Sequence, residues 1–342
     1  MVTLVTGGSG YVGETLIRHL RRRGDQIRVL DLVDNSDRPD DVEFIRGDIR
    51  DPGTVREALA GVDRVHHNVA QVPLAKDRAQ FWSVNVEGTK TLLNSALEAD
   101  VSKVVFVSSS AIYGIPANNP VDESVPARPL EEYGKAKLAG EDLVHGFVGR
   151  GLDVSVVRPR TVLGHGRLGI FQILFEWVRR GQPLYLLGRG DNRYQFVHAD
   201  DLAGVCLRAD EHRGYSVCLA GTDRFGTMRE LLEGLVQHAH STSPVRSLPF
   251  RPAQLIMGLA SKTGLSPLGD YHTLMYGREM YFDTSETQRK MNWQPKHSNA
   301  EMIAESYDWY IEHRDEVLAR NNASPHRSAV KLGALRLLEL LP

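Results

Sequence analysis

The first half of the chain alternates short apolar runs with longer amphipathic segments. Short apolar runs bounded by turn residues predict buried strands, and a repeat of three to four residues predicts helices. The expected strands are 2–6, 26–32, 42–48, 63–70, 103–110 and 153–159, and the expected helices are 11–23, 52–60, 78–99 and 133–151. Because strands and helices alternate and the strands are apolar, we predict an α/β fold with a doubly wound parallel sheet.

After residue 160 the alternation becomes less regular. Short strands are expected at 184–187, 194–198 and 215–220, with helices between them, and no linker rich in Gly, Pro or Ser separates the two halves. We therefore predict a sheet domain over 1–160, completed by some later segments, and a small interwoven C-terminal lobe over 161–312 that binds the substrate.

The tail, 313–342, is expected to contain an amphipathic helix after a Pro/Ser break, with apolar residues at helical spacing: Val330, Leu332, Leu335, Leu337, Leu338 and Leu341. Packing on the protein or on a dimer mate is the favoured interpretation of this helix. Contact with a membrane surface is the alternative.

Composition narrows the class of protein. The chain has 342 residues, 42% hydrophobic and 25% charged, with a formal net charge of -2. This balance is typical of a soluble globular protein and does not favour a nucleic-acid partner. The two cysteines show no metal-ligand spacing, and His66 and His67 are interpreted as structural, so no metal is expected. A strand-like beginning and the lack of a long apolar run favour a cytoplasmic protein.

The stretch "TGGSGYVG" lies between the first expected strand and the first expected helix. Gly7 allows a tight turn, Gly10 allows a pyrophosphate to approach the backbone, and Gly13 allows the helix to lie close to the sheet. Tyr11 and Val12 open the helix, whose free N–H groups attract phosphate. The pattern predicts a dinucleotide site in a Rossmann-type domain.

Further cofactor contacts are expected where later strands end. Asp31 ends the second strand, where a carboxylate accepts from both ribose hydroxyls and repels a 2′-phosphate, so NAD is favoured over NADP. A helix cap or turn residue is the alternative interpretation of Asp31. Asp48 is expected to accept from the adenine amino group, and Ile49 to pack on the ring. Small residues after the fourth strand admit the middle of the dinucleotide: Asn68, Val69, Ala70 and Gln71.

The sequence "YGKAK" places Tyr133 and Lys137 four residues apart, on one face of the helix 133–151. A free tyrosine has a pKa of ~10, and a nearby ammonium group favours its phenolate. The lysine is also placed to hold the ribose of the cofactor. The serines of "VVFVSSSAIYG" end the preceding strand and are expected to hydrogen-bond the reacting oxygen.

With "NVEGT", "SSSAIYG", "VRPRTVLG" and "FVHADDLA", these motifs resemble the extended short-chain dehydrogenase/reductase superfamily, in its NAD-dependent epimerase/dehydratase branch, to about residue 312. The resemblance implies a catalytic triad of Ser109, Tyr133 and Lys137, with Ser110 as the alternative serine. It implies that Asn85 supports the site and that Pro159, Arg160 and Thr161 line the nicotinamide end. It also implies a homodimer formed through the helices 78–99 and 133–151.

Departures from the family pattern narrow the range of reactions that we expect. Family dehydratases carry an acid after the catalytic Ser/Thr, whereas Ser110 and Ala111 follow Ser109, so dehydration is not expected. Thr161 stands where sugar-nucleotide enzymes of the family often carry Asn. We expect an NAD-dependent epimerase or oxidoreductase acting on a secondary alcohol of a nucleotide-activated sugar. The alternatives are a 3β-hydroxysteroid dehydrogenase-like enzyme, an oxoacyl reductase, or a non-enzymatic NAD-sensing protein.

Two further sites have competing interpretations. The family places an arginine on the substrate phosphate where Arg193 stands, while a surface ion pair with Asp191 or a nearby acid is the structural interpretation. Asp200 and Asp201 are expected to cap the following helix.

Overall fold

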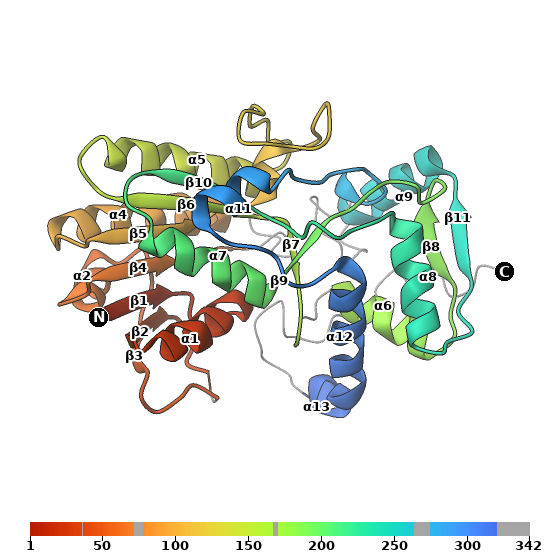
Figure 1. Ribbon diagram of the computed structural model, residues 1–342, viewed down its shortest axis with the longest axis horizontal. Coiled ribbons are helices and arrows are strands. Elements are labelled where there is room, and N and C mark those ends of the chain that lie inside the picture. The colour runs from red at the N-terminus through yellow and green to blue at the C-terminus, as the bar shows by residue number, and fades with distance from the viewer. Residues whose placement is uncertain (36, 72–77, 167–169, 263–273, 320–342) are drawn as a thin grey trace.

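A seven-stranded sheet forms the larger part of the molecule in the computed structural model, which describes the chain except residues 36, 72–77, 167–169, 263–273 and 320–342 (Figure 1). Its strands lie in the order β10-β6-β5-β4-β1-β2-β3, and neighbouring strands are parallel. They are β1 (Val2–Thr6), β2 (Gln26–Asp31), β3 (Glu43–Arg46), β4 (Arg64–His67), β5 (Lys103–Val107), β6 (Val154–Pro159) and β10 (Ser216–Ala220). The predicted α/β fold is confirmed.

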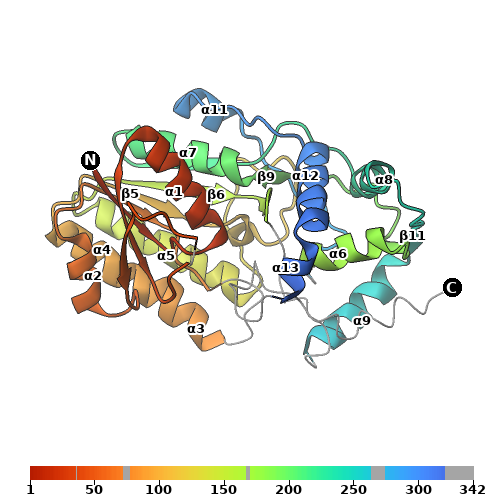
Figure 2. The same cartoon turned by 90° about the horizontal axis from the view of Figure 1, so that it is seen from below.

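Helices cover both faces of this sheet (Figure 2). Alternate strand residues point to opposite faces, so Leu4 packs into the core beneath α2 (Pro52–Leu59), α4 (Thr89–Glu98) and α5 (Glu132–Val148). Its neighbour Val5 packs beneath α1 (Tyr11–Arg23) on the other face. The helix α7 (Ala199–Glu211) packs beside α1, and α11 (Ser285–Met291) lies against β10.

The strand order reverses at β1, which lies between β2 and β4. The chain builds the sheet outward from β1 in one direction through β3, and then in the other direction from β4 to β10. Ligands of open parallel sheets bind at the carboxyl ends of the strands beside such a reversal. The loops after β1, β4, β5 and β6 therefore carry the candidate site.

The segment expected as one helix over 78–99 is interrupted in the structure. It consists of α3 (Arg78–Trp82), a π-helical turn over Ser83–Gly88, and α4. A Cβ at Gly88 would lie 2.6 Å from Cγ2 of Ile49, so this helix packs closely on the segment after β3. The widened turn carries Asn85 at the edge of the site, and such turns are frequent at functional positions.

The remaining segments form a lobe with its own core (Figure 1). Two short parallel pairs contribute to it, β7 (Thr161–Leu163) with β9 (Phe196–His198) and β8 (Leu184–Leu187) with β11 (Val245–Leu248). Its helices are α6 (Ile170–Arg179), α8 (Met228–His238), α9 (Phe250–Lys262), α12 (Asn299–Glu312) and α13 (Arg314–Ala319). Although β10 and α7 fall within 161–312, they belong to the sheet unit, so the two units are interwoven along the chain.

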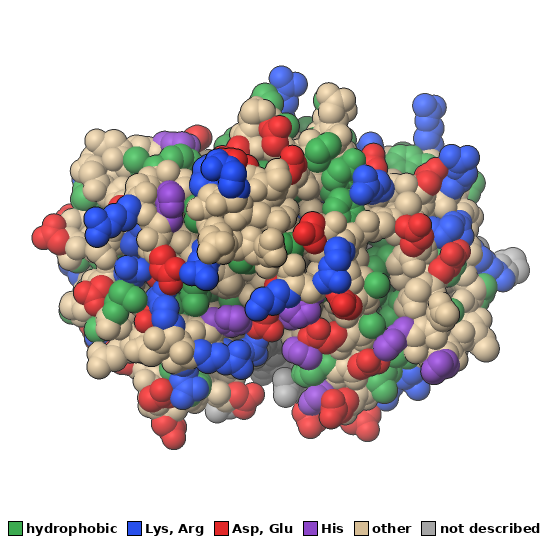
Figure 3. Space-filling model, viewed as in Figure 1, with side chains coloured by type: hydrophobic (Ala, Val, Ile, Leu, Met, Phe, Trp, Pro, Cys, Tyr) green, Lys and Arg blue, Asp and Glu red, His purple; other side chains and the backbone are tan. Residues whose placement is uncertain are grey.

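The surface shows no large area of a single charge on the face drawn in Figure 3, where acidic and basic side chains are intermixed. Within the described part of the chain, no helix has the length and apolar character needed to cross a membrane. The amphipathic helix expected in the tail, around 330–341, lies outside the described residues.

Candidate active site

The loop between β1 and α1 requires glycine at positions where the backbone is crowded. Gly7 has a φ of 70°, and a Cβ there would lie 2.9 Å from the backbone nitrogen of Val69. A Cβ at Gly13 would lie 2.2 Å from the carbonyl oxygen of Gly7. Gly13 thus admits α1 close to Gly7 and Gly8, the turn that directly follows β1. Gly10 is the N-cap of α1 and provides no side-chain cap.

This loop fits a dinucleotide phosphate. The first N–H groups of a helix have no partner within the helix, and a pyrophosphate satisfies them where no side chain does. Tyr11 is buried, with 5% exposed, and Val12 packs partly into the core, so both anchor the start of α1. The bare backbone around Gly10 is the part left for a ligand.

Asp31 lies at the end of β2, beside the loop. Its carboxylate accepts from the backbone N–H groups of Ser9, at 3.1 Å, and Leu32, at 2.7 Å. Burial raises the pKa of Asp31, against the opposing effect of these hydrogen bonds. A donor such as a ribose hydroxyl stabilises this desolvated carboxylate.

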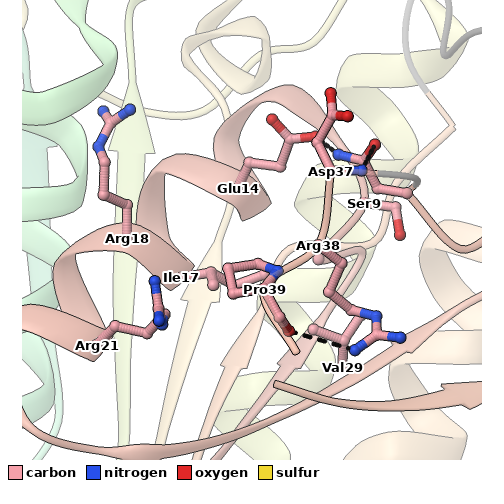
Figure 4. A pocket seen from close by; sticks show the side chains of 11 residues that line it. Ser9, Glu14, Ile17, Arg18, Arg21, Val29, Asp37, Arg38 and Pro39 are labelled. Atoms are coloured by element: carbon pink, nitrogen blue, oxygen red, sulfur yellow. Dashed lines mark hydrogen bonds between the residues drawn. The ribbon is translucent and has the colours of Figure 1, made fainter. Parts of the chain in front are cut away.

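A cavity of about 260 Å³ adjoins the same loop at Gly8 and Ser9 (Figure 4). Its arginines are already engaged: Arg18 pairs with Asp200, Arg21 with Asp41, and Arg38 with Asp34. The cavity adjoins the glycine loop and does not include the catalytic residues expected from the sequence.

The two residues expected to contact adenine, Asp48 and Ile49, make other contacts in this structure. Both carboxylate oxygens of Asp48 accept from Arg50, which lowers the pKa of Asp48. Ile49 is 4% exposed and packs in the core against Gly88. The expectation that Ile49 presents its side chain to the adenine ring is therefore wrong for this conformation, because the π-helical turn covers it.

The loop after β4 is held by Asn85. Its amide oxygen accepts from the Gln71 N–H at 2.8 Å, and its amide nitrogen donates to the Gln71 carbonyl at 3.1 Å. Asn68 donates its N–H to the Thr6 carbonyl, while Val69 and Ala70 are half-buried. Asn85 thus shapes the loop expected to meet the dinucleotide.

His67 joins this loop to the helix behind it. One ring nitrogen lies 2.8 Å from the Thr6 hydroxyl and the other 2.9 Å from the Thr89 hydroxyl. Burial lowers the pKa of His67 to about 3, with a smaller contribution from Lys137. A neutral, hydrogen-bonded His67 fits the structural role expected from the sequence.

The three serines after β5 have different partners. Ser108 donates to Glu141, and Ser110 accepts from Nη1 of Arg160 at 3.0 Å. Ser109 caps the following 3-10 turn by accepting from the Ala111 N–H at 3.1 Å, and it is the only half-buried one of the three. No hydrogen bond within the described part of the chain has the Ser109 hydroxyl as its donor, so its proton can be donated to a ligand.

Tyr133 lies in the first turn of α5, next to these serines. It is 9% exposed and contacts Phe81 edge to face. The close approach of α5 to the segment after Ser109 depends on Gly134, where a Cβ would lie 2.5 Å from the Ala111 carbonyl oxygen. The sequence interpretation gave Gly134 no role, although it stands within the "YGKAK" motif.

Lys137 lies one turn after Tyr133 and is 3% exposed. Its Nζ donates to the Val107 carbonyl at 2.8 Å and lies over the Phe106 ring. Burial lowers the pKa of Lys137 to about 8, while Glu141 acts in the opposite direction. The lysine is therefore a buried, partly destabilised cation at the end of β5, where an anion or phenolate would stabilise its charge.

A buried ion pair beneath Lys137 was not expected from the sequence. Glu141, 1% exposed, pairs with Arg158 at 2.6 Å, and Arg158 donates to the Tyr113 hydroxyl at 2.7 Å. The spacing of four residues from Lys137 to Glu141 was the available signal, since it places them on one helix face.

The lobe contributes further residues to this edge. Thr161 and Tyr194 share a hydroxyl–hydroxyl hydrogen bond of 3.0 Å. The guanidinium of Arg193 lies over the rings of Phe225 and Tyr281, while Asp191 pairs with Arg189. Asp191 is therefore not the ion-pair partner of Arg193, while a pair with another nearby acid stays a prediction. The capping expectation is also corrected, because His198 is the N-cap of α7 and Asp200 and Asp201 follow in its first turn.

A histidine-rich cluster joins the lobe to the sheet unit, with ligand atoms of His198, His297 and Glu305 within 4.8 Å of one another. Nδ1 of His198 accepts from the Asp200 N–H, so Nε2 carries the proton and donates to Glu305 at 3.1 Å. A metal bound at Nε2 would displace that proton and disturb the cap. The arrangement favours a hydrogen-bonded cluster over a metal site.

Comparison with known proteins agrees with this geometry. Residues 3–218 match the NAD dependent epimerase/dehydratase family. The chain belongs to this family. An uncharacterized protein of Sinorhizobium fredii, y4nG, is 49% identical over 99% of this chain and 85% of its own length. A UDP-glucose 4-epimerase of Halalkalibacterium halodurans is 30% identical over 92% of this chain and 96% of its own.

A mouse sterol-4-alpha-carboxylate 3-dehydrogenase is also similar, with 28% identity over 64% of this chain and 61% of its own. Among solved structures, MoeE5 in complex with UDP-glucuronic acid and NAD has a TM-score of 0.76 and 25% identity, covering 91% of this chain and 99% of its own. The expected cofactor, NAD, is confirmed for the family, and the chain is an NAD-dependent enzyme of the short-chain dehydrogenase/reductase type.

Proposed function

We propose that this enzyme epimerises a secondary alcohol of a nucleotide-activated sugar, using Tyr133 as the base. The observation that supports the proposal is the packing of the first turns of α5 against the segment that follows β5. Tyr133 and Lys137 share one face of α5, and the approach at Gly134 brings this helix against the segment that follows Ser109. NAD, when bound, accepts a hydride from the substrate carbon and returns it.

Each residue of the triad has a distinct part in the proposed reaction. Tyr133 takes the proton of the substrate hydroxyl and gives it back when the ketone is reduced. Lys137, a buried cation, favours the phenolate form of Tyr133. Ser109 has a hydroxyl proton free to donate, so it holds the reacting oxygen through both half-reactions. The sugar turns over between them, and the net redox change is zero.

Other residues are assigned to binding. The loop with Gly7, Gly10 and Gly13 holds the pyrophosphate, and Asp31 holds the adenosine ribose. Arg193 is assigned to the substrate diphosphate: it is exposed at the lobe, and its guanidinium lies over the neighbouring rings of Phe225 and Tyr281. The Halalkalibacterium epimerase supports a nucleotide-sugar substrate, because it aligns with nearly the whole chain.

A screen with several substrates tests the proposal. The NAD-loaded protein is melted with UDP-, dTDP-, GDP- and CDP-sugars and with a sterol, since a ligand that binds only the folded protein stabilises it by RT ln(1 + [L]/Kd) and so raises the melting temperature. The stabilising sugar is then incubated with the enzyme, and its epimer is sought by NMR. Epimer formation without accumulation of NADH supports the proposal. Stabilisation by the sterol alone, with NADH released, identifies the dehydrogenase alternative instead.

We also propose a homodimer formed by α3, α4 and α5. Trp82 of α3 is 42% exposed, and its indole donates to Glu132 at the start of α5, so an apolar ring lies at the surface where these helices meet. Light scattering coupled to size exclusion checks the mass, and Trp82→Glu is expected to shift a dimer to monomer. A monomeric wild-type protein would contradict this proposal.

A further inference from the structure

Arg160 is a buried cation without a counter-ion at the edge of the candidate site. It directly follows β6 and is 1% exposed. Its Nη1 donates to Ser110 and its Nη2 to the Met280 carbonyl at 3.0 Å, while Nε has no hydrogen-bond partner. No ion pair of the described residues includes Arg160. A charged side chain is rarely buried in this way unless it is paired.

The surroundings compensate for the charge only in part. The guanidinium lies 4.8 Å from the ring centroid of Tyr194 and 5.7 Å from that of Phe282. Ring faces and neutral oxygens stabilise a cation less than a carboxylate does, and an unpaired buried ion is costly. The nearby acid, Glu141, is already taken by Arg158.

The site as a whole therefore carries surplus positive charge. The Lys137 ammonium is bound to Val107, and the Arg160 guanidinium is bound to Ser110, three residues further along the same segment. Glu141 favours the charged form of Lys137, but no ion pair of the described residues includes Arg160. A phenolate at Tyr133 would balance Lys137 further, and Arg160 is left for an anion from the ligand.

We propose that Arg160 is the specificity-determining residue that selects a substrate with a carboxylate close to the reacting carbon. This inference rests on the proposed function, because it assigns the substrate class of the same site. Ser110, held by Arg160, directly follows the proposed catalytic Ser109, so this guanidinium is bound to the segment that carries the proposed donor to the reacting oxygen. A diphosphate is the other oxyanion that a nucleotide sugar supplies, and Arg193, on the lobe, is the residue assigned to it.

The test compares two substrates that differ only in this group. The NAD-loaded wild type is titrated calorimetrically with UDP-glucuronate and with UDP-glucose. We expect tighter binding of UDP-glucuronate, and Arg160→Gln should reduce that preference by about tenfold or more, since hydrogen bonds to charged groups are the strong ones. Affinity for UDP-glucose should change much less, because its C6 hydroxyl carries no charge.

Three variants serve as controls. Arg160→Lys keeps the charge and should retain most of the preference, even if Arg160→Gln folds poorly. Arg193→Gln should weaken both ligands alike, because both carry the diphosphate. Arg189→Gln, at a residue whose side chain is 89% exposed, should change neither affinity.

The outcomes separate the two proposals. Equal wild-type affinity for the two sugars, or an equal loss of both in Arg160→Gln, overturns the carboxylate inference and leaves the epimerase proposal standing. An equal loss would assign Arg160 to the diphosphate or to the packing of the site. Failure of both UDP-sugars to bind the wild-type protein contradicts the proposed function and the inference together.

Discussion

Nζ of Lys137 donates a hydrogen bond to the backbone carbonyl of Val107 at 2.8 Å. This bond ties the face of α5 that carries Lys137 to the last residue of β5, just before the three serines. The lysine ammonium is therefore held at a backbone carbonyl beside the segment that carries the serines. Tyr133 lies one turn earlier on the same face of α5, so the same bond helps to fix its position.

Replacing Tyr133 by Phe removes the proposed proton acceptor and keeps the ring. Turnover should fall by about 10²–10⁴-fold, because general acid–base catalysis by one group contributes that much. Packing against Phe81 and NAD binding should survive, so the melting temperature should change little. Steady-state assays beside melting curves measure both. Tyr215→Phe, at a partly exposed tyrosine bound to His145, is the control. A Tyr133→Phe rate within about twofold of the parent would end the catalytic assignment.

NAD binding should depend on the charge of Lys137. Burial lowers the pKa of this lysine to about 8, so the ammonium that we expect to hold the ribose is present below that pH and is lost above it. Calorimetric affinity for NAD should therefore weaken as the pH rises through about 8. Lys137→Met should weaken NAD binding, lower turnover and flatten this pH dependence.

The matched control for that variant is Lys135→Met, on the same helix but at the surface, where the lysine pairs with Glu132.

The lowered pKa of Lys137 also affects stability. Between about 8 and the ordinary value of 10.5, the unfolded chain binds a proton at Lys137 that the folded protein does not. The free energy of unfolding therefore receives a contribution from Lys137 that increases with pH in this window. An NAD affinity independent of pH would contradict the assignment.

Cofactor choice should depend on Asp31. Its partly desolvated carboxylate accepts from ribose hydroxyls and repels a 2′-phosphate, so NAD should bind much more tightly than NADP. Asp31→Ala should narrow the difference between the two affinities. The exposed Asp41→Ala serves as the control. Equal calorimetric affinities for NAD and NADP in the wild-type protein would refute this role.

The enzyme should not eliminate water from a nucleotide sugar. The residues after Ser109 are Ser110 and Ala111, and Ser110 is bound to Arg160, so this segment offers no carboxylic acid to protonate a leaving hydroxyl. Mass spectrometry of the incubated sugar should show a product of unchanged mass. A product lighter by one water would restore the dehydratase interpretation.

Two glycines of α5 should respond oppositely to alanine. At Gly134 the new Cβ would lie 2.5 Å from the Ala111 carbonyl oxygen, so Gly134→Ala should destabilise the protein by about 1–3 kcal/mol and lower turnover. At Gly146 nothing lies within 4 Å of the new Cβ, so Gly146→Ala should stabilise by about 0.5–1 kcal/mol. Denaturant unfolding measures both. Equal effects of the two variants would show that the approach at Gly134 does not constrain α5.

The sequence by itself determined the sheet, the NAD cofactor and the family. Apolar runs such as 2–6 and 103–107 became the central strands, because burial on both faces demands continuous apolar character. The glycine loop could also be predicted from the sequence, since only glycine tolerates the crowding at Gly7 and Gly13. These signals are local: each depends on residues adjacent in the chain or one helical turn apart.

The tertiary structure determined which polar groups hydrogen-bond to one another. The sequence shows three adjacent serines, but only the folded chain binds Ser108 to Glu141 and Ser110 to Arg160, leaving Ser109 half-buried with a proton to donate. Likewise, Ile49 was covered by Gly88 across the fold rather than left for adenine. Hydrogen bonds and burial depend on which distant segments approach one another, and neither periodicity nor motif spacing carries that information.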